Sequence, residues 1–214
     1  VVIQSPNYWG QLENWEKVKS ILNDDKILLI AISNPIYLSI LKSPGDCGAD
    51  IYIGEGQSLG TPVSYGGPYL GIISVKEKLT RKIPGRIVGR TTDINGKDSF
   101  VLTLQTREQH IRRERATSNI CTNQGLIALR CTIYMSLMGK YGLPTVTKRC
   151  YDNAQYAAAQ IVKLNNFSLH FNSREFVKEF VVKTSFNLDG LIKLANKNGF
   201  RLGKVKNDKS NSLL

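Results

Sequence analysis

Histidine and cysteine are scarce in this 214-residue chain, which contains two histidines and four cysteines. The histidines, His110 and His170, are far apart, and no carboxylate–histidine spacing matches a metal site. The cysteines, at positions 47, 121, 131 and 150, match neither a zinc site nor a CxxC redox pair. The sequence therefore predicts no metal centre, and we expect free thiols in a reducing cytoplasm.

The sequence also lacks long apolar runs and has few acidic residues. No run approaches the roughly 20 apolar residues that span a bilayer, so we expect no membrane partner. Lysine and arginine number 29 against 17 acidic residues, a net charge of +12. Such an excess is compatible with a basic nucleic-acid-binding protein. That function stays a remote alternative, because the lysines are scattered and no zinc finger, RNA-binding aromatic motif or helix-turn-helix is present.

The first residues of the chain are not expected to be a signal peptide. The first residues, Val-Val-Ile-Gln, contain no initiator methionine and no basic segment of a signal peptide. They resemble the end of a strand, so we expect the chain to begin inside a larger protein. Residues 204–214 are polar and rich in lysine, and we expect a frayed end or a premature stop there.

Strand and helix patterns alternate along the first part of the chain. Apolar runs predict strands at residues 26–32, 49–53 and 70–75. Helical spacing predicts helices at residues 11–22, 35–41 and 76–82. This order is typical of an α/β fold. The Asn95-Gly96 pair predicts a hairpin turn between extended segments at residues 87–90 and 99–104.

The second part of the chain begins with helical patterns. A helix is predicted over residues 120–138 with an apolar face, and Gly139 and Gly142 are expected to end it; the face comprises Leu126, Leu129, Ile133 and Leu137. A second helix is predicted over 145–164, followed by a strand at 179–183, a helix at 188–198 capped by Gly199 and a short strand at 200–202. We therefore predict a larger domain over residues 1–140, with a hairpin near 86–104, and a small α+β domain over 141–214.

The most unusual segment is residues 54–71, GEGQSLGTPVSYGGPYLG, with six glycines in eighteen positions. Glycine loses more backbone entropy on folding than any other residue, so close approach of the backbone to a ligand or to another chain is the usual reason for such density. Glu55 is its one charged residue, and it contains no lysine, histidine or cysteine. We interpret it as a segment that shapes a site without performing the chemistry.

The densest polar cluster is residues 107–123, REQHIRRERATSNICTN. Its arginines can bind carboxylates or phosphates, and its neutral side chains can cap a helix whose N-terminus attracts anions; these neutral residues are Thr117, Ser118, Asn119, Thr122 and Asn123. An arginine-rich strut with a polar helix cap explains the same residues equally well. His110 is more typical of a hydrogen-bonding structural residue than of a catalytic base.

Two further arginines, Arg86 and Arg90, alternate with glycines in PGRIVGR at residues 84–90. They could bind an anion or pair with acidic residues across an interface. A tight connection between two elements is the simpler explanation, and the segment alone does not decide between them.

Four segments together closely resemble one family: GADIYIGEGQSLGTPVSYGGPYLG (48–71), IPGRIVGRTTDINGK (83–97), VLTLQTREQHIRRERATSNICTNQ (101–124) and YMSLMGKYGL (134–143). They are similar to the P-protein family of the glycine cleavage system, in particular to subunit 1 of its two-subunit glycine dehydrogenases (decarboxylating). The resemblance covers nearly the whole chain and weakens past Lys148. It is to the C-terminal half of that subunit.

The resemblance implies a fold and a reaction. The fold is that of the aspartate-aminotransferase-like, type I pyridoxal-phosphate enzymes, with a partial large α/β domain and a small C-terminal α+β domain. The reaction is the decarboxylation of glycine on pyridoxal phosphate, with transfer of the aminomethyl group to the lipoyl group of the carrier H-protein.

The resemblance also implies how the work is divided between subunits. The cofactor lysine of the family lies in the sibling subunit, and alignment on residues 66–68 places Gln57 where that lysine would fall. Glutamine has no amine for a Schiff base. We therefore expect no covalently bound cofactor in this chain and pyridoxal phosphate in subunit 2, with two copies of each subunit.

Active sites of this fold type lie at subunit interfaces. The residues that this chain would offer to the partner's site are Thr117, Ser118, Asn119, Thr122 and Asn123, with Arg86 and Arg90 as weaker candidates. The alternative is a purely structural assembly subunit with no residue in any active site.

Overall fold

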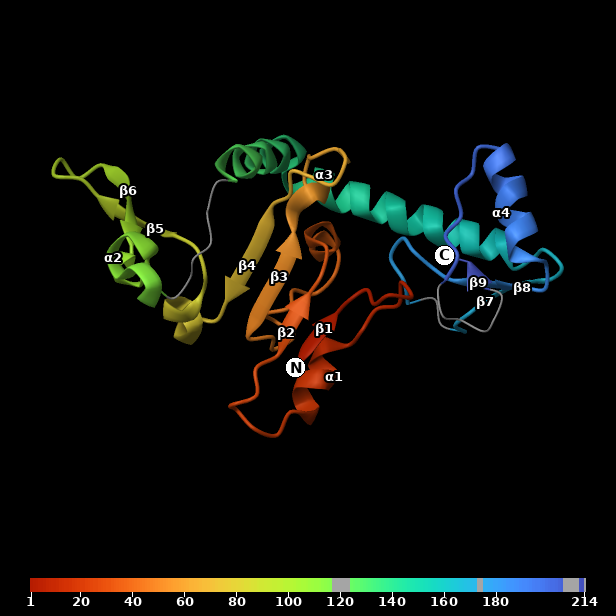
Figure 1. Cartoon of the computed structure of the whole chain (residues 1–214), viewed down its shortest axis with the longest axis horizontal. Helices are drawn as coiled ribbons and strands as arrows, with labels where there is room; N and C mark the ends of the chain where they lie inside the picture. The colour runs from red at the N-terminus through yellow and green to blue at the C-terminus, as the bar shows by residue number, and fades with distance from the viewer. Residues whose placement is uncertain (117–123, 173–174, 206–211, 214) are drawn as a thin grey trace.

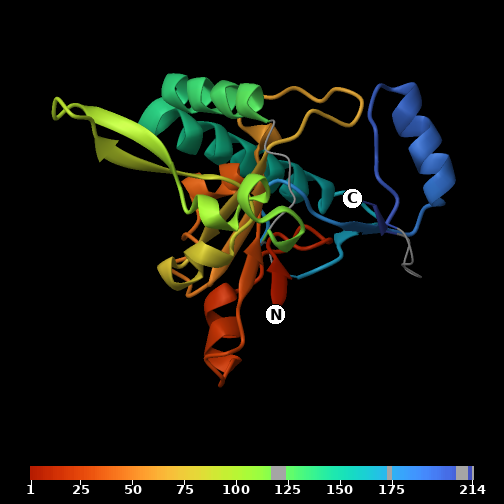
Figure 2. The same cartoon turned by 60° about the vertical axis from the view of Figure 1, so that its left-hand side comes forward.

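The computed structural model describes residues 1–116, 124–172, 175–205 and 212–213. A four-stranded sheet lies at the centre, a hairpin extends to one side, and the long helix α3 leads to a smaller group of strands and a helix at the other side (Figure 1). The turned view in Figure 2 shows α1 below the sheet and α3 along its upper end.

The central sheet has the strand order β1-β2-β3-β4. Its strands are β1 (Val2–Gln4), β2 (Ile30–Ile32), β3 (Ile51–Glu55) and β4 (Gly71–Val75). The first three are parallel and β4 is antiparallel to β3. All three predicted strands are present, and the first residues of the chain form a fourth.

The strand predicted from residue 26 begins later, at Ile30. Asp24 is the reason, because its backbone carbonyl accepts a hydrogen bond from Ile27 N–H at 2.9 Å and its side chain accepts one from Lys26 N–H at 2.8 Å. The apolar run is therefore divided between a turn and a short strand.

The helix predicted over residues 11–22 is shorter, because α1 spans Trp15–Ile21. Asn14 caps it and accepts a hydrogen bond from Lys17 N–H. The residues before Asn14 are not helical, because Gln11 forms a β-bridge with Phe176. Trp15 is buried against a small cluster on the sheet that comprises Leu29, Ala31 and Ala49.

Three short 3-10 helices connect the strands: η1 (Pro35–Ser39), η2 (Gly56–Ser58) and η3 (Glu77–Lys82). The first and third correspond to the helices predicted at 35–41 and 76–82. Asn34 caps η1 by accepting a hydrogen bond from Ile36 N–H.

The predicted hairpin is confirmed, with β5 at Ile87–Thr92 and β6 at Asp98–Thr103. Asp93 organises the turn, because its side chain accepts hydrogen bonds from the N–H groups of Asn95 and Lys97. The hairpin projects away from the sheet in both views (Figures 1 and 2).

Three short helical turns follow the hairpin: η4 (Gln105–Arg107), α2 (Gln109–Arg112) and η5 (Arg113–Arg115). Arg107 is buried, and its guanidinium donates to the backbone carbonyls of Ile83 and Gly85. This arginine therefore ties the end of the hairpin to its beginning.

The two long helices predicted after residue 119 are joined into α3, which spans Gly125–Ile161. Gly139 interrupts it with a φ of 59° and a ψ of −166°. The helix end predicted at Gly139 is therefore a kink, and the helix continues through Gly142. Pro144 lies inside α3, five residues after this kink. Residues 120–123 of the prediction lie outside the described residues.

The last part contains a sheet of three antiparallel strands: β7 (Phe167–Leu169), β8 (Val182–Thr184) and β9 (Ser212–Leu213). The helix α4 (Leu188–Lys197) is preceded by the capping residue Asn187 and followed by Gly199 at a φ of +82°, as predicted. The strand predicted at 179–183 lies later, at β8. The strand predicted at 200–202 is wrong, because these residues are not in a strand, and a single bridge joins the nearby Lys204 to Leu213.

Two hydrophobic clusters support these parts separately. The first is the α1–sheet cluster, and the second comprises Ala154, Ala158 and Phe176. The domain boundary predicted at 140/141 falls inside α3, one residue beyond the kink at Gly139.

Candidate functional site

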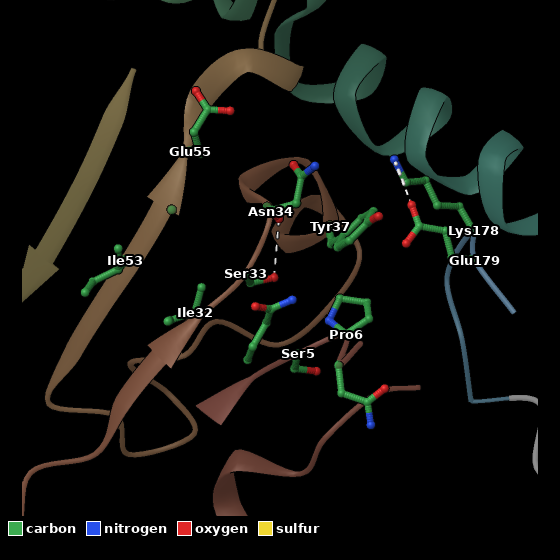
Figure 3. Close-up of a pocket in the computed structure, with 13 residues that line it drawn as sticks. Ser5, Pro6, Ile32, Ser33, Asn34, Tyr37, Ile53, Glu55, Lys178 and Glu179 are labelled. Atoms are coloured by element: carbon green, nitrogen blue, oxygen red, sulfur yellow. Dashed lines mark hydrogen bonds and ion pairs between the residues drawn. The ribbon is translucent and has the colours of Figure 1, made fainter. Parts of the chain in front are cut away.

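A cavity of about 410 Å³ opens where β1, β2 and β3 end (Figure 3). In open α/β sheets, ligands bind outside the carboxyl ends of parallel strands. Residues at those ends contribute most of the lining, and the turn before α1, η1 and the segment before β8 close it. The lining residues are Gln4, Ser5, Pro6, Asn7, Ile32, Ser33, Asn34, Tyr37, Ile53, Gly54, Glu55, Lys178 and Glu179.

Several polar groups in the lining are held by the fold itself. Asn34 Oδ1 accepts hydrogen bonds from Ile36 N–H at 3.1 Å and from the hydroxyl of Ser58 at 2.6 Å. It therefore connects the end of β2 to η2. The backbone carbonyl of Ser33 accepts from the Tyr52 hydroxyl at 3.0 Å. The side of the cavity formed by Ser33 and Asn34 therefore consists of amide and carbonyl groups that hydrogen bonds hold in place.

The segment before β8 contributes the charged side of the cavity. Lys178 Nζ lies 3.7 Å from Glu179 Oε1 and 5.8 Å from the centre of the Tyr37 ring, a cation–π distance. Burial, followed by the nearby Glu179, raises the pKa of the Tyr37 phenol well above its usual value. Tyr37 is therefore a neutral phenol at physiological pH. The cavity offers one ammonium group, two carboxylates and several neutral polar groups to a small polar molecule.

The glycine-rich segment begins at this cavity and then leaves it. Gly54 and Glu55 are in the lining, and η2 follows directly. The backbone N–H of Gly56 donates to the carbonyl of Leu70 at 2.7 Å, which closes residues 56–70 into a loop. The tip is exposed to solvent, with Val63 88% exposed and Tyr65 fully exposed. The loop thus presents an apolar tip outward.

Close backbone approach occurs in this loop at Gly60, and the neighbour is the chain's own helix α3. A Cβ at Gly60 would lie 2.7 Å from Cβ of Tyr134, and the φ there is +96°. Only glycine satisfies both constraints. Part of the glycine density therefore serves packing against α3.

Gln57 lies in η2 and is half-buried. Its backbone N–H donates to Glu55 Oε1 at 2.9 Å, and its carbonyl accepts from Thr61 N–H at 3.0 Å. It lies two residues after the last lining residue of β3. Its side-chain amide can donate and accept hydrogen bonds and cannot form an imine.

The two arginines predicted as weaker candidates lie outside the cavity lining. Arg86 is exposed in the connection before β5. Arg90 is exposed on β5, and its Nη2 lies 2.6 Å from Oδ2 of Asp98 on β6. His110, on α2, is exposed with Nε2 3.4 Å from Gln105 Oε1. The five polar candidates Thr117, Ser118, Asn119, Thr122 and Asn123 lie outside the described residues.

A buried carboxylate with lysine partners lies at the other end of β3, where that strand begins. Asp50, 2% exposed, precedes β3 and pairs with Lys19 at 3.1 Å and Lys76 at 2.9 Å. Burial alone would raise its pKa, but hydrogen bonds from Leu29 N–H, Lys76 and Lys19 outweigh burial and hold the pKa well below the usual range. Asp50 therefore connects α1, β3 and the residue after β4, far from the cavity.

Sequence patterns alone did not indicate that Asn34, Tyr37 and Lys178 line a cavity. Asn34 carried a usable signal, since an Asn-Pro pair after an apolar strand marks a capped turn at the carboxyl end of a strand. Lys178 carried no such signal, because it reaches the cavity only through the tertiary packing of the segment before β8.

Neither a metal-binding group nor a membrane-spanning helix is found in the part of the chain that the structure describes. In residues 1–116, 124–172, 175–205 and 212–213, no three histidine, cysteine, aspartate or glutamate side chains form a metal-binding group. Within the same ranges, every helix is too short or too polar to cross a bilayer.

Comparisons with known proteins agree on one family. The model of the glycine cleavage system P-protein family matches residues 1–213. A probable glycine dehydrogenase (decarboxylating) subunit 1 of Prosthecochloris aestuarii is 49% identical over 203 residues, which are 95% of this chain and 46% of the relative. The corresponding protein of Chlorobium luteolum is 52% identical over 184 residues, 86% of this chain and 41% of the relative. The chain thus spans less than half the length of these relatives.

Solved structures agree with the sequence comparison. The crystal structure of the inhibitor-bound glycine decarboxylase (P-protein) of the glycine cleavage system superposes with a TM-score of 0.89 at 34% identity, over all of this chain and 49% of that one. The glutamate decarboxylase of Lactobacillus brevis, 13% identical with a TM-score of 0.61 over 96% of this chain and 46% of its own, shares the fold. The predicted fold class, that of type I pyridoxal-phosphate enzymes, is confirmed.

Proposed function

We propose, because the chain belongs to the glycine cleavage system P-protein family, that it is a noncatalytic part of a glycine decarboxylase. In this proposal the complex decarboxylates glycine in the cytoplasm and passes the aminomethyl group to the lipoyl group of the H-protein. The catalytic lysine and its pyridoxal phosphate belong to subunit 2. This chain completes the assembly, which has two copies of each subunit.

The observation that carries the proposal is the residue at position 57. The resemblance places Gln57 at the position of the cofactor lysine, and Gln57 sits directly beyond the cavity at the carboxyl ends of the strands. The cavity residues do not fit a covalently held pyridoxal phosphate, because the lysine in their lining, Lys178, faces Glu179 and the ring of Tyr37. In this proposal, no chemical step of the reaction takes place on a residue of this chain.

Exposed apolar side chains support docking onto a sibling subunit. The predicted apolar face of α3 is exposed, with Leu126 77% and Leu137 82% exposed. The tip of the glycine-rich loop adds Val63 and Tyr65. Exposed apolar surface that is continuous along a helix marks an interaction site. In our proposal subunit 2 covers these surfaces and receives the polar residues 117–123 near its own active site.

The first test is the chemistry of the chain with pyridoxal phosphate. The purified chain is incubated with the cofactor, reduced with borohydride and digested for mass spectrometry, with subunit 2 treated in parallel. We expect one fully labelled lysine in subunit 2 and only weak, scattered labelling in this chain. Stoichiometric labelling of a single lysine here, at Lys178 or elsewhere, contradicts the proposal.

The second test is reconstitution. Release of carbon dioxide from carboxyl-labelled glycine is measured for this chain, for subunit 2 and for their mixture, each with H-protein. We expect the chain alone to be inactive and to form a complex with subunit 2 in sedimentation. Turnover by this chain without subunit 2 contradicts the proposal. Absence of any complex contradicts it as well.

A further inference from the structure

Positive charge is concentrated in the hairpin and in the turns on either side of it. Residues 76–116 contain eleven lysine and arginine residues and five acidic ones, which gives this segment a net charge of +6. The whole chain of 214 residues carries +12. About a fifth of the sequence therefore contributes half of the net positive charge.

Arg107 brings the two most basic stretches of this segment together. Its buried guanidinium donates to the carbonyls of Ile83 and Gly85, so the connection before β5 lies against the turns after β6. Both views show the yellow turn of η3 beside the green turns that include α2 (Figures 1 and 2). Exposed basic side chains thus gather at the base of the hairpin. We call them the cationic patch, which comprises Arg81, Lys82, Arg86, Arg112, Arg113 and Arg115.

Little of this charge is neutralised within the part of the chain that the structure describes. Arg115 Nε lies 4.0 Å from Glu114 Oε1, and both side chains are largely exposed, so this pair is weak. No other member of the patch forms an ion pair with a described residue. The nearby Glu108 is already paired with Arg107. The patch is therefore available to negative charges on another molecule.

The composition of the patch indicates a protein partner. Five of its six members are arginine, the basic residue that is enriched at protein–protein interfaces, where lysine is depleted. The adjoining hairpin presents apolar side chains, because its register pairs Val88 with Leu102 on the face that also carries Phe100. Val88 is 59% exposed and Phe100 is 71% exposed. Arginines beside exposed apolar side chains match the surface of a protein that carries both acidic and apolar groups.

We propose that the cationic patch and the adjoining hairpin face bind an acidic face of the carrier H-protein, an inference that rests on the proposed function. The carrier must bind and leave once for each aminomethyl group, so its association must be fast and reversible. Opposite charges on two surfaces accelerate association, whereas permanent interfaces depend more on apolar contact. The surfaces proposed above for subunit 2, on α3 and the loop tip, are apolar. Two kinds of surface thus match two kinds of partner.

The first measurement is direct binding without glycine. The complex of this chain with subunit 2 is immobilised beside the 214-residue chain alone, and the dissociation constant of lipoylated H-protein is measured by surface plasmon resonance. We expect that constant to rise about tenfold between about 50 and about 250 mM sodium chloride, because salt screens exposed charges. Binding that does not depend on salt overturns the inference.

Two double substitutions provide a matched pair. Arg81→Glu with Arg112→Glu reverses one charge on each stretch of the patch and is expected to weaken H-protein binding about tenfold. Lys193→Glu with Lys197→Glu reverses two exposed charges on α4, at the other end of the molecule in Figure 1. The net charge of the two variants is the same, and we expect the second to change binding less than about twofold. Circular dichroism verifies that both variants fold.

The second measurement separates docking from chemistry. Release of carbon dioxide from glycine by the reconstituted complex is followed with H-protein and with free lipoamide, which carries the reacting disulfide without the protein. In the patch variant we expect the KM for H-protein to rise about tenfold, with turnover on free lipoamide unchanged. An equal loss with both acceptors places the patch in the active site and overturns the inference.

The remaining outcomes also decide. Equal weakening by the two double substitutions removes the patch as the docking surface. Failure of the patch variant to sediment with subunit 2 assigns the surface to the subunit interface. Displacement of H-protein by a single-stranded oligonucleotide, with tighter binding of the oligonucleotide, assigns it to nucleic acid. A native complex that binds H-protein at the patch but releases no carbon dioxide contradicts the proposed function and leaves the docking surface standing.

Discussion

The carboxylate of Glu55 accepts a hydrogen bond from the backbone N–H of Leu70 at 2.9 Å and thereby joins the two ends of the glycine-rich loop. The same oxygen accepts from Gln57 N–H, and the Gly56–Leu70 backbone bond lies beside it. The loop is thus fastened at its neck, while Val63 and Tyr65 at its tip are exposed. Glu55 therefore links the geometry of the cavity to that of the loop.

Replacing Glu55 is expected to loosen this loop. Glu55→Ala removes the acceptor of two backbone N–H groups, and loss of such a capping side chain costs about 1 kcal/mol. We expect chymotrypsin to cleave after Tyr65 about fivefold faster, measured by time-resolved electrophoresis. Glu77→Ala, at the start of η3, is the control. Equal cleavage rates in the two variants would show that the neck does not govern the loop.

Glycine at position 60 is expected to be irreplaceable. Gly60→Ala meets Tyr134 Cβ at 2.7 Å and forces a side chain into a φ of +96°. Overpacking and backbone strain together cost about 2–4 kcal/mol, measured by urea unfolding. Gly71→Ala is the matched control, because nothing lies within 4 Å of its added Cβ. A loss below about 0.5 kcal/mol at Gly60 would contradict the packing against α3.

Asp50 is expected to make stability depend on acid pH. Its pKa is lower in the folded chain than in the unfolded one, so its contribution is complete above the unfolded value near 4. The contribution is lost as the pH falls through the lower folded pKa. We expect the free energy of unfolding to decline below about pH 4 in the native chain, and more weakly in Asp50→Asn.

The size of the Asp50 effect follows from its surroundings. Asp50 is buried, but its lysine partners are 28% to 60% exposed, so solvent screens part of the attraction. We expect Asp50→Asn to cost about 2–3 kcal/mol at pH 7, below the range for fully buried pairs. Asp98→Asn, in the exposed pair with Arg90, is expected to cost less than about 1 kcal/mol. Equal losses at the two sites would contradict a structural role for Asp50.

The predicted contribution in trans can be separated from pure scaffolding. Asn119→Ala combined with Asn123→Ala removes two amide groups that we expect near the partner's active site. Turnover of the reconstituted complex is expected to fall at least tenfold, about 1.4 kcal/mol in activation free energy, with sedimentation unchanged. Asn198→Ala, after α4, is the control. Unchanged turnover in an intact complex would favour the assembly subunit with no residue in an active site.

Local sequence patterns predicted most of the secondary structure. The Asn95-Gly96 turn could be predicted because the hydrogen bonds that form it join Asp93 to residues at most four positions away. Gly199 was readable as a helix stop for the same reason. The predicted ends of helices and strands were wrong where residues distant in the sequence form contacts. Gln11, for example, forms a β-bridge with Phe176, and α1 therefore begins at Trp15 and not at Gln11.

The site was predictable only in part. The glycine density identified the loop, and Gln57 was identified by its place in a family motif. The sequence does not reveal the cavity, because Tyr37 and Lys178 come from distant segments that meet only when the segment before β8 packs near η1. Proximity of this kind leaves no periodicity or spacing in the chain.

Helix α3 shows most clearly which features depend on neighbouring residues and which depend on tertiary packing. Spacing predicted that Leu126, Leu129, Ile133 and Leu137 share one face, since helical geometry depends on neighbouring residues alone. Whether that face is buried depends on which other segments pack against it. The structure buries Ile127 and Cys131 of the adjacent face and leaves the predicted face open. A chain's own residues thus specify an apolar surface, while the segments that pack on it decide whether that surface becomes core or interface.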